Sequence, residues 1–169
     1  QVMAELVIQG QVKATACVNI ALIKYWGKAP ARDVEGANLP ACPSLSLTLR
    51  GLGTTTSVRF NPDLQRDRVQ LDGVEMDEAS VERLQPLLDS VRRRADVASC
   101  FDITTHNTVP TAAGLASSAS GAAALAGATA RCAGLDLSDS ELSALARMAS
   151  GSGSRSVYGC LLYTSDAAD

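Results

Sequence analysis

Residues 107–120 read NTVPTAAGLASSAS, a run of small residues that continues into an alanine-rich segment. Gly114 can take backbone angles that a side chain forbids, and its small neighbours let the backbone approach a ligand closely. Ser117, Ser118 and Ser120 supply hydroxyls and helix caps. The free N–H groups of a first helical turn, with the helix dipole behind them, favour an anion. The segment therefore predicts a phosphate-binding loop that opens a helix; the alternative is a core helix with an ordinary serine cap.

Two better-known kinds of phosphate loop do not fit this segment. No lysine follows the glycine in the Gly-Lys-Ser/Thr order of a Walker loop, and the spaced glycines of a dinucleotide-binding fingerprint are absent. Phosphate would then be held by backbone N–H groups and serine hydroxyls. The positive charges that neutralise it have to come from elsewhere in the chain.

One source of positive charge is the segment 19–28, which reads NIALIKYWGK. Lys24 and Lys28 are an even number of residues apart, so they share one face of a strand. Two lysines that face a core are costly unless an anion pairs with them, which makes a diphosphate or triphosphate the natural partner. The alternative is a frayed strand end with both lysines solvated.

A second source is the segment 150–159, which reads SGSGSRSVYG. Its small residues expose backbone N–H groups and hydroxyls. Arg155 can form two parallel hydrogen bonds to a phosphate or a carboxylate. The segment predicts a second anion site, and a flexible linker is the alternative.

The periodicity along the chain predicts a mixture of strands and helices, strands first. We expect one or two strands within Val12–Ile23 and a strand over Phe101–Thr105. We also expect two hairpins. One pairs Ser44–Leu49 with Thr54–Phe60, which follows Gly51 and Gly53, and the other turns at Asp72-Gly73. Expected helices are Val81–Val91 with an interruption or restart at Pro86, Ser118–Cys132 ended by Gly134, and one capped by Ser138 and Glu141 that ends near Ala149. This order indicates an α+β domain of two layers.

The bulk composition excludes several classes of protein. With 169 residues, 46% of them hydrophobic, the chain is long enough for one domain with a real core. A net charge of −3 gives no general attraction for nucleic acid or for an anionic membrane. The basic run Arg92–Arg94 falls where a helix should end and complements its dipole. No signal peptide and no apolar run long enough for a membrane span is visible.

Five cysteines are scattered without metal-ligand spacing, which argues against a disulfide framework and a zinc site and fits a reducing cytoplasm. His106, the only histidine, stands beside Asn107 without a cysteine or aspartate partner in its motif. We therefore expect a structural or solvated histidine rather than a general base.

Pro110–Ser120 resembles the phosphate loop of the GHMP kinases, and the wording PTAAGLASSASG narrows the resemblance to the mevalonate diphosphate decarboxylases. Residues 19–28 resemble the N-terminal signature of that family, and residues 150–159 resemble its third segment. Three motifs in the right order are far more specific than one alone. The resemblance covers about residues 12–159.

This resemblance implies the N-terminal domain of a GHMP kinase, truncated: an α+β two-layer sandwich like ribosomal protein S5 domain 2, with a left-handed βαβ crossover. Residues 1–159 would form the ATP- and substrate-binding domain. Residues 160–169 depart from the family pattern and look like a translated sequencing adapter, so we expect an artefactual tail and no C-terminal domain. The family's essential aspartate belongs to that C-terminal half, so the fragment itself is expected to be inactive.

The implied activity is ATP-dependent decarboxylation of mevalonate 5-diphosphate to isopentenyl diphosphate, a lyase step of isoprenoid and lipid biosynthesis in the cytoplasm. ATP and Mg²⁺ would be the cofactors, and a homodimer is one state open to the parent protein. Alternatives within the superfamily are a mevalonate 3-kinase-like enzyme and a bisphosphomevalonate decarboxylase. A non-catalytic RNA-contacting module is a remote alternative, because it needs a basic face or stacking aromatics and only 4% of this chain is aromatic.

The resemblance also implies roles for single residues. Lys24, near the transferred phosphoryl group, and Arg155, toward the carboxylate, would be catalytic. The substrate-binding residues would be Ala21, Tyr25, Trp26, Gly27, Lys28, Ser150, Gly151, Ser152, Gly153, Ser154 and Arg155. The ATP-binding residues would be Arg68, Asn107, Pro110, Ala112, Ala113, Gly114, Leu115, Ala116, Ser117, Ser118 and Ser120.

Three of these assignments need a further remark. Either Ser117 or Ser118 would ligate Mg²⁺. The alternative for Arg68 is that it is an arginine on a surface strand and does not bind the ligand. Gly153 stands where relatives commonly have alanine, which we expect to be a mild change.

Overall fold

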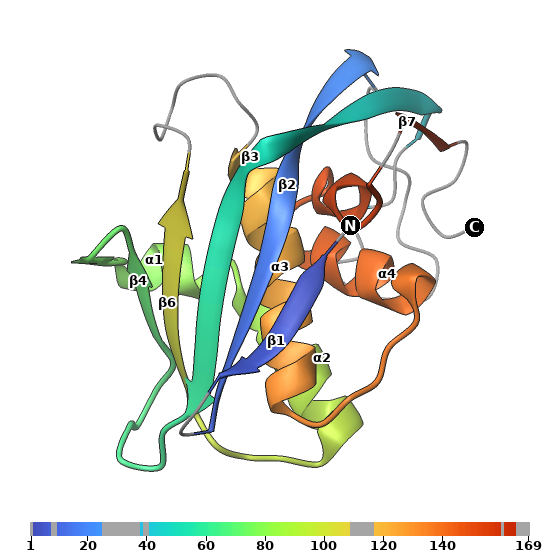
Figure 1. Ribbon diagram of the computed structural model, residues 1–169. Coiled ribbons are helices and arrows are strands. Elements are labelled where there is room, and N and C mark those ends of the chain that lie inside the picture. The colour runs from blue at the N-terminus through green and yellow to red at the C-terminus, as the bar shows by residue number, and fades with distance from the viewer. Residues whose placement is uncertain are drawn as a thin grey trace.

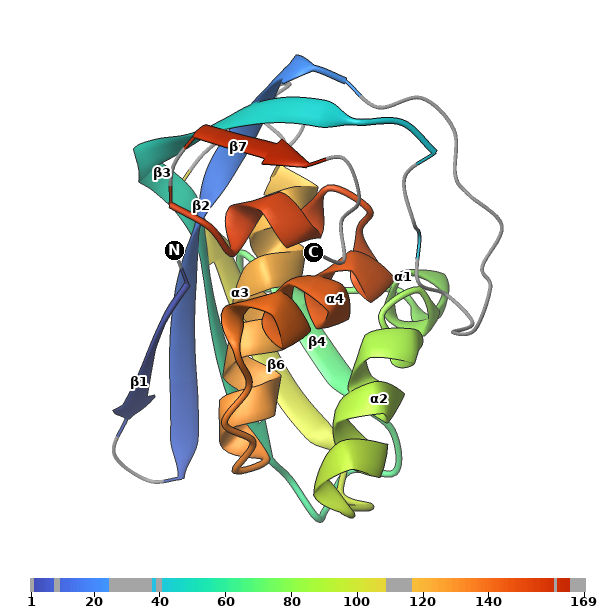
Figure 2. The same cartoon turned by 90° about the vertical axis from the view of Figure 1, so that its right-hand side faces the viewer.

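The computed structural model describes residues 2–7, 10–24, 38, 41–108, 117–159 and 161–164. These residues form a sheet with helices packed on one of its faces (Figures 1 and 2). The strands are β1 (Met3–Val7), β2 (Gln11–Ile23), β3 (Ser44–Phe60), β4 (Arg68–Leu71), β5 (Val74–Glu75), β6 (Phe101–Asn107) and β7 (Leu161–Thr164). The helices are α1 (Glu78–Glu82), α2 (Gln85–Ala95), α3 (Ser117–Cys132), α4 (Asp139–Ala149) and the 3₁₀ helix η1 (Gly153–Ser156). The predicted two-layer α+β fold is confirmed.

The strand order is β1-β2-β3-β6-β4-β5, and β7 pairs with the first part of β3. Only β4 and β6 are parallel among the described pairs. In Figure 1 both of these strands point upward and β6 lies to the right of β4. Helices α1 and α2, which connect β4 to β6 along the chain, lie behind the sheet. The crossover is therefore left-handed, opposite to the hand that most parallel crossovers take.

The expected hairpin between residues 44–49 and 54–60 is wrong, because β3 runs through Gly51 and Gly53 as one strand. Its register with β2 shifts just past Cys17, where β3 carries extra residues. Gly51 has φ +83°, and a Cβ on Gly53 would lie 2.3 Å from the carbonyl oxygen of Ala16. The two glycines thus allow an irregular bulge and a close approach of two backbones, not a reversal of the chain.

Helix α3 lies at the centre of the core, between the sheet and the other helices (Figure 2). Eleven of its residues are buried, and most of them are alanine. A Cβ on Gly127 would lie 2.7 Å from Cγ1 of Val2, so small residues are what allow this close packing. The helix ends as expected before Gly134, which has φ +75°.

The other local signals also form the expected structures. Asp72 and Gly73 have positive φ and join β4 to β5. Pro86 stands in the first turn of α2, after the short helix α1. Ser138 and Glu141 form both hydrogen bonds of a capping box at the start of α4.

Helix α2 is fixed to the sheet through Asp67, whose side chain is 2% exposed. Arg92 donates to this carboxylate and to Asp89, and its guanidinium lies 5.0 Å from the ring centroid of Phe101. The backbone N–H of Phe101 also donates to Asp67 at 2.7 Å. Arg92 therefore does more than complement a helix dipole: it closes a buried network between α2 and β6.

In the described part of the chain, no helix is both long and apolar enough to cross a membrane.

Candidate functional site

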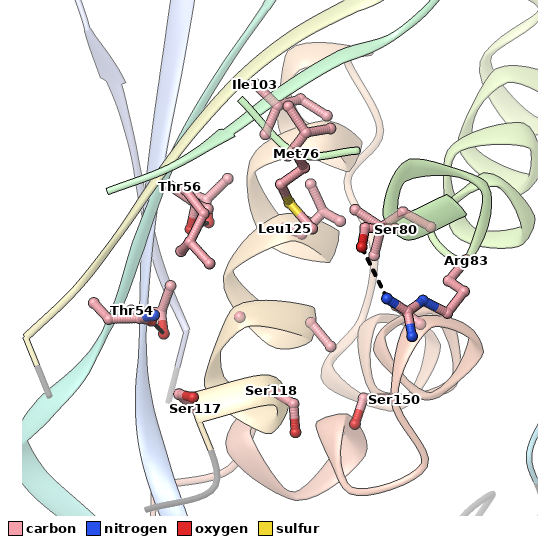
Figure 3. A pocket seen from close by; sticks show the side chains of 18 residues that line it. Thr54, Thr56, Met76, Ser80, Arg83, Ile103, Ser117, Ser118, Leu125 and Ser150 are labelled. Carbon is pink, nitrogen blue, oxygen red and sulfur yellow. Dashed lines mark hydrogen bonds between the residues drawn. The ribbon is translucent and has the colours of Figure 1, made fainter. Parts of the chain in front are cut away.

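A cavity of about 440 Å³ lies between the helix-facing side of the sheet, the turn between α1 and α2, and the first half of α3 (Figure 3). Residues from β3, β4, β6, α1, α3 and the end of α4 line it. They are Thr54, Thr56, Val69, Leu71, Met76, Ser80, Arg83, Leu84, Ile103, Thr105, Asn107, Ser117, Ser118, Gly121, Ala122, Leu125, Ala149 and Ser150.

The cavity has two chemically different ends (Figure 3). Met76, Ile103 and Leu125 surround one end, which is apolar. The hydroxyls of Ser118 and Ser150 lie at the other, beside the start of α3. A ligand with a flat apolar part and an anionic part would match this arrangement, because the apolar part would lose contact with water and the anion would meet hydroxyls and a helix N-terminus.

A chain of hydrogen bonds fixes the wall between the sheet and α3. The Thr54 hydroxyl lies 2.7 Å from Oδ1 of Asn107 and 2.7 Å from the hydroxyl of Ser120. Ser120 in turn donates to the carbonyl oxygen of Ser117 at 3.1 Å. Thr54 is 1% exposed and Ser120 is fully buried, so these bonds are shielded from water and hold the first turn of α3 against β3 and β6.

The segment 150–159 is tied to the first segment and packs against helices α3 and α4. Asn19 Nδ2, on β2, donates to the hydroxyl of Ser156 at 2.7 Å. On the other side, a Cβ on Gly153 would lie 2.9 Å from Cβ of Ala122 in α3 and 2.8 Å from the carbonyl oxygen of Ala146. In this backbone an added methyl would need its neighbours to move, so the glycine fits a junction that is tighter than alanine allows. The expectation that glycine in place of the family's usual alanine is a mild change stays a prediction.

Among the residues that the structure describes, the third segment contacts the first and shares a cavity with the second, whereas a pocket formed by all three segments stays a prediction. Asn19 of the first segment contacts the third, and Ser117 and Ser118 of the second line the same cavity as Ser150 of the third. Ser150 and Ser152 also have their hydroxyls 3.3 Å apart. The remaining predicted site residues of the first two segments, Tyr25, Trp26, Gly27, Lys28, Pro110, Ala112, Ala113, Gly114, Leu115 and Ala116, lie outside the described residues.

The other predicted substrate residues fall in three environments. Lys24 follows the last residue of β2 and is exposed, so the expectation that it faces the core is wrong. Ala21, Gly151 and Ser152 are half-buried, whereas Ser154 and Arg155 are buried within η1.

Arg68 is not brought into the cavity. It lies on the face of the sheet opposite the helices, because its neighbour Val69 points into the core and side chains alternate along a strand. There its guanidinium makes two hydrogen bonds to Asp102, at 3.0 and 2.9 Å, and Arg59 binds the same carboxylate. The structure thus gives Arg68 a place in the sheet, and its contact with a nucleotide stays a prediction.

The electrostatics around Asp102 follow from this arrangement. Burial is the largest influence on the carboxyl and opposes its ionisation. The hydrogen bonds and charges of Arg68 and Arg59 together outweigh it, so the pKa of Asp102 lies below its ordinary value. The same hydrogen bond raises the pKa of Arg68.

The described residues include no group of three histidine, cysteine, aspartate or glutamate side chains that could hold a metal ion. His106 is exposed, with its Nδ1 3.6 Å from a carboxylate oxygen of Asp72, and does not line the cavity. This position matches a structural or solvated histidine.

Several cavity residues were not found from the sequence. Thr54, Met76, Ser80 and Arg83 come from segments without a recognisable motif. Each reaches the cavity only because β3, the β4–β5 hairpin and α1 pack together there. The strand expected over Thr54–Phe60 includes Thr54, but nothing local indicated which strand borders the site.

Comparison with known proteins gives one consistent family. A sequence model described as "Diphosphomevalonate decarboxylase-like N-terminal domain" matches residues 16–168. The human diphosphomevalonate decarboxylase is 44% identical over 164 residues, which cover 88% of this chain and 39% of the human protein.

Solved structures agree with this result. The mevalonate diphosphate decarboxylase of Enterococcus faecalis superposes with a TM-score of 0.78 at 46% identity, covering 89% of this chain and 46% of the other. A structure of the enzyme MDDEF in complex with MVAPP, AMPPCP and magnesium gives a TM-score of 0.77 at 41% identity, covering 91% and 50%. The chain thus spans half or less of the length of these relatives, and by the match of the family model to residues 16–168 it belongs to the diphosphomevalonate decarboxylase-like N-terminal domain family.

Proposed function

We propose that the chain is the N-terminal part of an ATP-dependent diphosphomevalonate decarboxylase, which converts mevalonate 5-diphosphate to isopentenyl diphosphate. The observation that carries the proposal is the cavity shared by Ser117 and Ser118 of one segment and Ser150 of another. Its apolar and hydroxyl-lined ends match the two halves of a nucleotide. The family relationship supports the same assignment, since the relatives compared above are named for this reaction.

The nucleotide would lie along the cavity. Its base would contact Met76, Ile103 and Leu125, where burial of an aromatic ring removes apolar surface from water. Its phosphates would lie beside Ser117 and Ser118, where hydroxyls and the first N–H groups of α3 donate hydrogen bonds. Mg²⁺, when bound, would neutralise phosphate oxygens, and the hydroxyl of Ser117 or Ser118 is the kind of oxygen ligand that this ion accepts.

The second substrate would lie between the first and third segments. The hydroxyls of Ser150 and Ser152 are close enough to act together on one anionic group. The exposed ammonium group of Lys24 has no ion pair among the described residues, so it is available to a phosphate. Arg155 would bind the carboxylate that is lost, because a guanidinium matches a carboxylate with two parallel hydrogen bonds.

These residues would act by position and charge. The terminal phosphoryl group of ATP would pass to the tertiary 3-hydroxyl of the substrate, giving ADP. The C–O bond of the new phosphate ester would then break and inorganic phosphate would leave. The carboxylate would depart as carbon dioxide, and the electron pair of the broken C–C bond would form the double bond. Because charge is redistributed without a covalent enzyme intermediate, fixed hydrogen-bond donors and positive charges would supply most of the stabilisation of the transition state. We place the enzyme in the cytoplasm, with a homodimeric parent as a further expectation.

The test uses the uninterrupted parent protein. Incubation with ATP, Mg²⁺ and mevalonate 5-diphosphate should release one inorganic phosphate and one carbon dioxide for each ADP formed. A parent in which Ser150 is replaced by alanine should bind the substrate more weakly, whereas replacement of the remote, exposed Arg66 should not. ADP formation without carbon dioxide would favour the mevalonate 3-kinase-like alternative, and no turnover on any phosphorylated mevalonate would contradict the proposal.

A further inference from the structure

Arg83 is the only charged side chain among the described residues that line the cavity. It stands at the C-terminal end of α1, and its side chain extends to the cavity wall (Figure 3). The other lining residues are apolar side chains, hydroxyls, an amide and a glycine. No carboxylate lines the described part of this cavity, so its only formal charge is positive and favours an anionic ligand.

The charge of Arg83 is not neutralised by a carboxylate within ion-pair distance among the described residues. Arg66, Arg68 and Arg92 each have such a partner. Arg83 instead donates from a terminal guanidinium nitrogen to the neutral hydroxyl of Ser80 at 2.9 Å. That bond orients the guanidinium and leaves its other N–H donors available to a ligand, although, after the hydrogen bonds from Ser80, its charge also contributes to lowering the pKa of the nearby Asp77.

The position of Arg83 along the cavity indicates what it would contact. In Figure 3 its guanidinium lies between the apolar end, marked by Met76, and the hydroxyl end, marked by Ser118 and Ser150. A nucleotide that extends from one end to the other would pass this guanidinium where its base and sugar give way to its phosphates. Phosphate is the stronger partner there, because a charged guanidinium–phosphate pair can form two parallel hydrogen bonds.

We propose that Arg83, oriented by Ser80, binds the phosphate chain of the nucleotide and so makes this cavity select nucleotides over nucleosides. The proposal rests on the proposed function, since it assigns a residue to the same nucleotide site. Contact with the base face would be a different role, because a cation over an aromatic ring would bind nucleoside and nucleotide alike.

The experiment measures the affinity of the chain for adenosine, AMP and ADP by calorimetric titration. Arg83→Met should weaken AMP and ADP by about tenfold or more, and adenosine by less than about twofold. Arg83→Lys should recover part of the loss, because it keeps the charge and loses the planar fork. Ser80→Ala should cause a smaller loss for the same two ligands. Thermal unfolding of each variant checks that it folds.

The matched control is Arg66→Met, which removes the same charge from a residue 76% exposed and paired with Glu78 outside the cavity. It should leave all three affinities unchanged. Unchanged ADP affinity in Arg83→Met, or an equal loss for adenosine, would overturn the role proposed for Arg83. A wild-type chain that binds none of the three ligands would instead contradict the proposed function.

Discussion

Gly153 shows how tightly a single residue of the third segment is held. A Cβ added to it would lie within 3 Å of both the carbonyl oxygen of Ala146 and the methyl group of Ala122, which leaves no room for a side chain. Backbone conformation is not the reason, because Gly153 lies in a 3₁₀ helix without a positive φ. The glycine is required by packing between η1, α3 and α4.

We predict that Gly153→Ala lowers the free energy of unfolding by about 1–3 kcal/mol, because the added methyl overpacks this junction. Gly121→Ala is the matched control: a Cβ there meets nothing within 4 Å, and alanine is the better helix former. It should raise stability by roughly 0.5–1 kcal/mol. Urea denaturation measures both, and equal stability of Gly153→Ala and wild type would show that the junction relaxes freely.

Thr54 illustrates at the same scale why part of the site could not be predicted. As a residue type in a strand it has no distinguishing feature, since threonines also stand at positions 55 and 56. Its role arises from partners that are distant in sequence, Asn107 on β6 and Ser120 on α3. By contrast, Ser117 and Ser118 were predicted because the loop and the helix start are written in one continuous segment.

Among the elements, those fixed by local chemistry were predicted and those fixed by tertiary contacts were not. The Asp72-Gly73 turn and the capping box of Ser138 with Glu141 need only neighbours in sequence. The course of β3 depends on a distant strand: Gly53 is glycine because the Ala16 carbonyl approaches it. Glycines that permit close approach and glycines that permit a turn look alike in a sequence, which is why the hairpin prediction failed.

The three strands β3, β6 and β4 are linked on their outer face by Asp102, which binds Arg59 and Arg68. Because the pKa of Asp102 lies below its unfolded value, its contribution to stability is complete above that unfolded value. The contribution is lost as the pH falls through the lower, folded-state pKa. The free energy of unfolding therefore falls as the solution is acidified below about pH 4, the ordinary range for a carboxyl.

We predict that Asp102→Asn is less stable than wild type at neutral pH and that the gap narrows on acidification below about pH 4. The measurement is the midpoint of urea denaturation as a function of pH for both proteins. The amide keeps the shape of the side chain and cannot ionise, so a gap that stays constant across this range would contradict the assigned role.

At the scale of the whole molecule, the site combines groups from both layers. The three motif segments could be found because each motif is continuous in sequence, and the second and third of them share the cavity as expected. The apolar end of the cavity was not, because Met76, Ile103 and Leu125 meet only when the β4–β5 hairpin, β6 and α3 pack together. The sequence therefore indicated residues at the hydroxyl-lined end of the cavity and carried no signal for the apolar end.

We predict that the chain alone binds nucleotide but releases no phosphate above background from ATP, Mg²⁺ and mevalonate 5-diphosphate. The reason is that the resemblance assigns the essential aspartate to the C-terminal half of the family, and this chain covers 39% of the human relative. A coupled phosphate assay measures this outcome, with the uninterrupted parent as the positive control. Clear turnover by the chain would show that its own residues complete the reaction.

The burial of α3 on nearly all sides has a consequence for how the domain can change over evolutionary time. A helix enclosed by a sheet and by other helices can neither roll nor slide to accommodate a bulkier side chain. Ligand preference is therefore easier to change through the other walls of the cavity, among them the β4–β5 hairpin and α1, than through the buried residues of α3. Variants selected for a new cosubstrate should accumulate their substitutions in those walls and leave the alanines untouched.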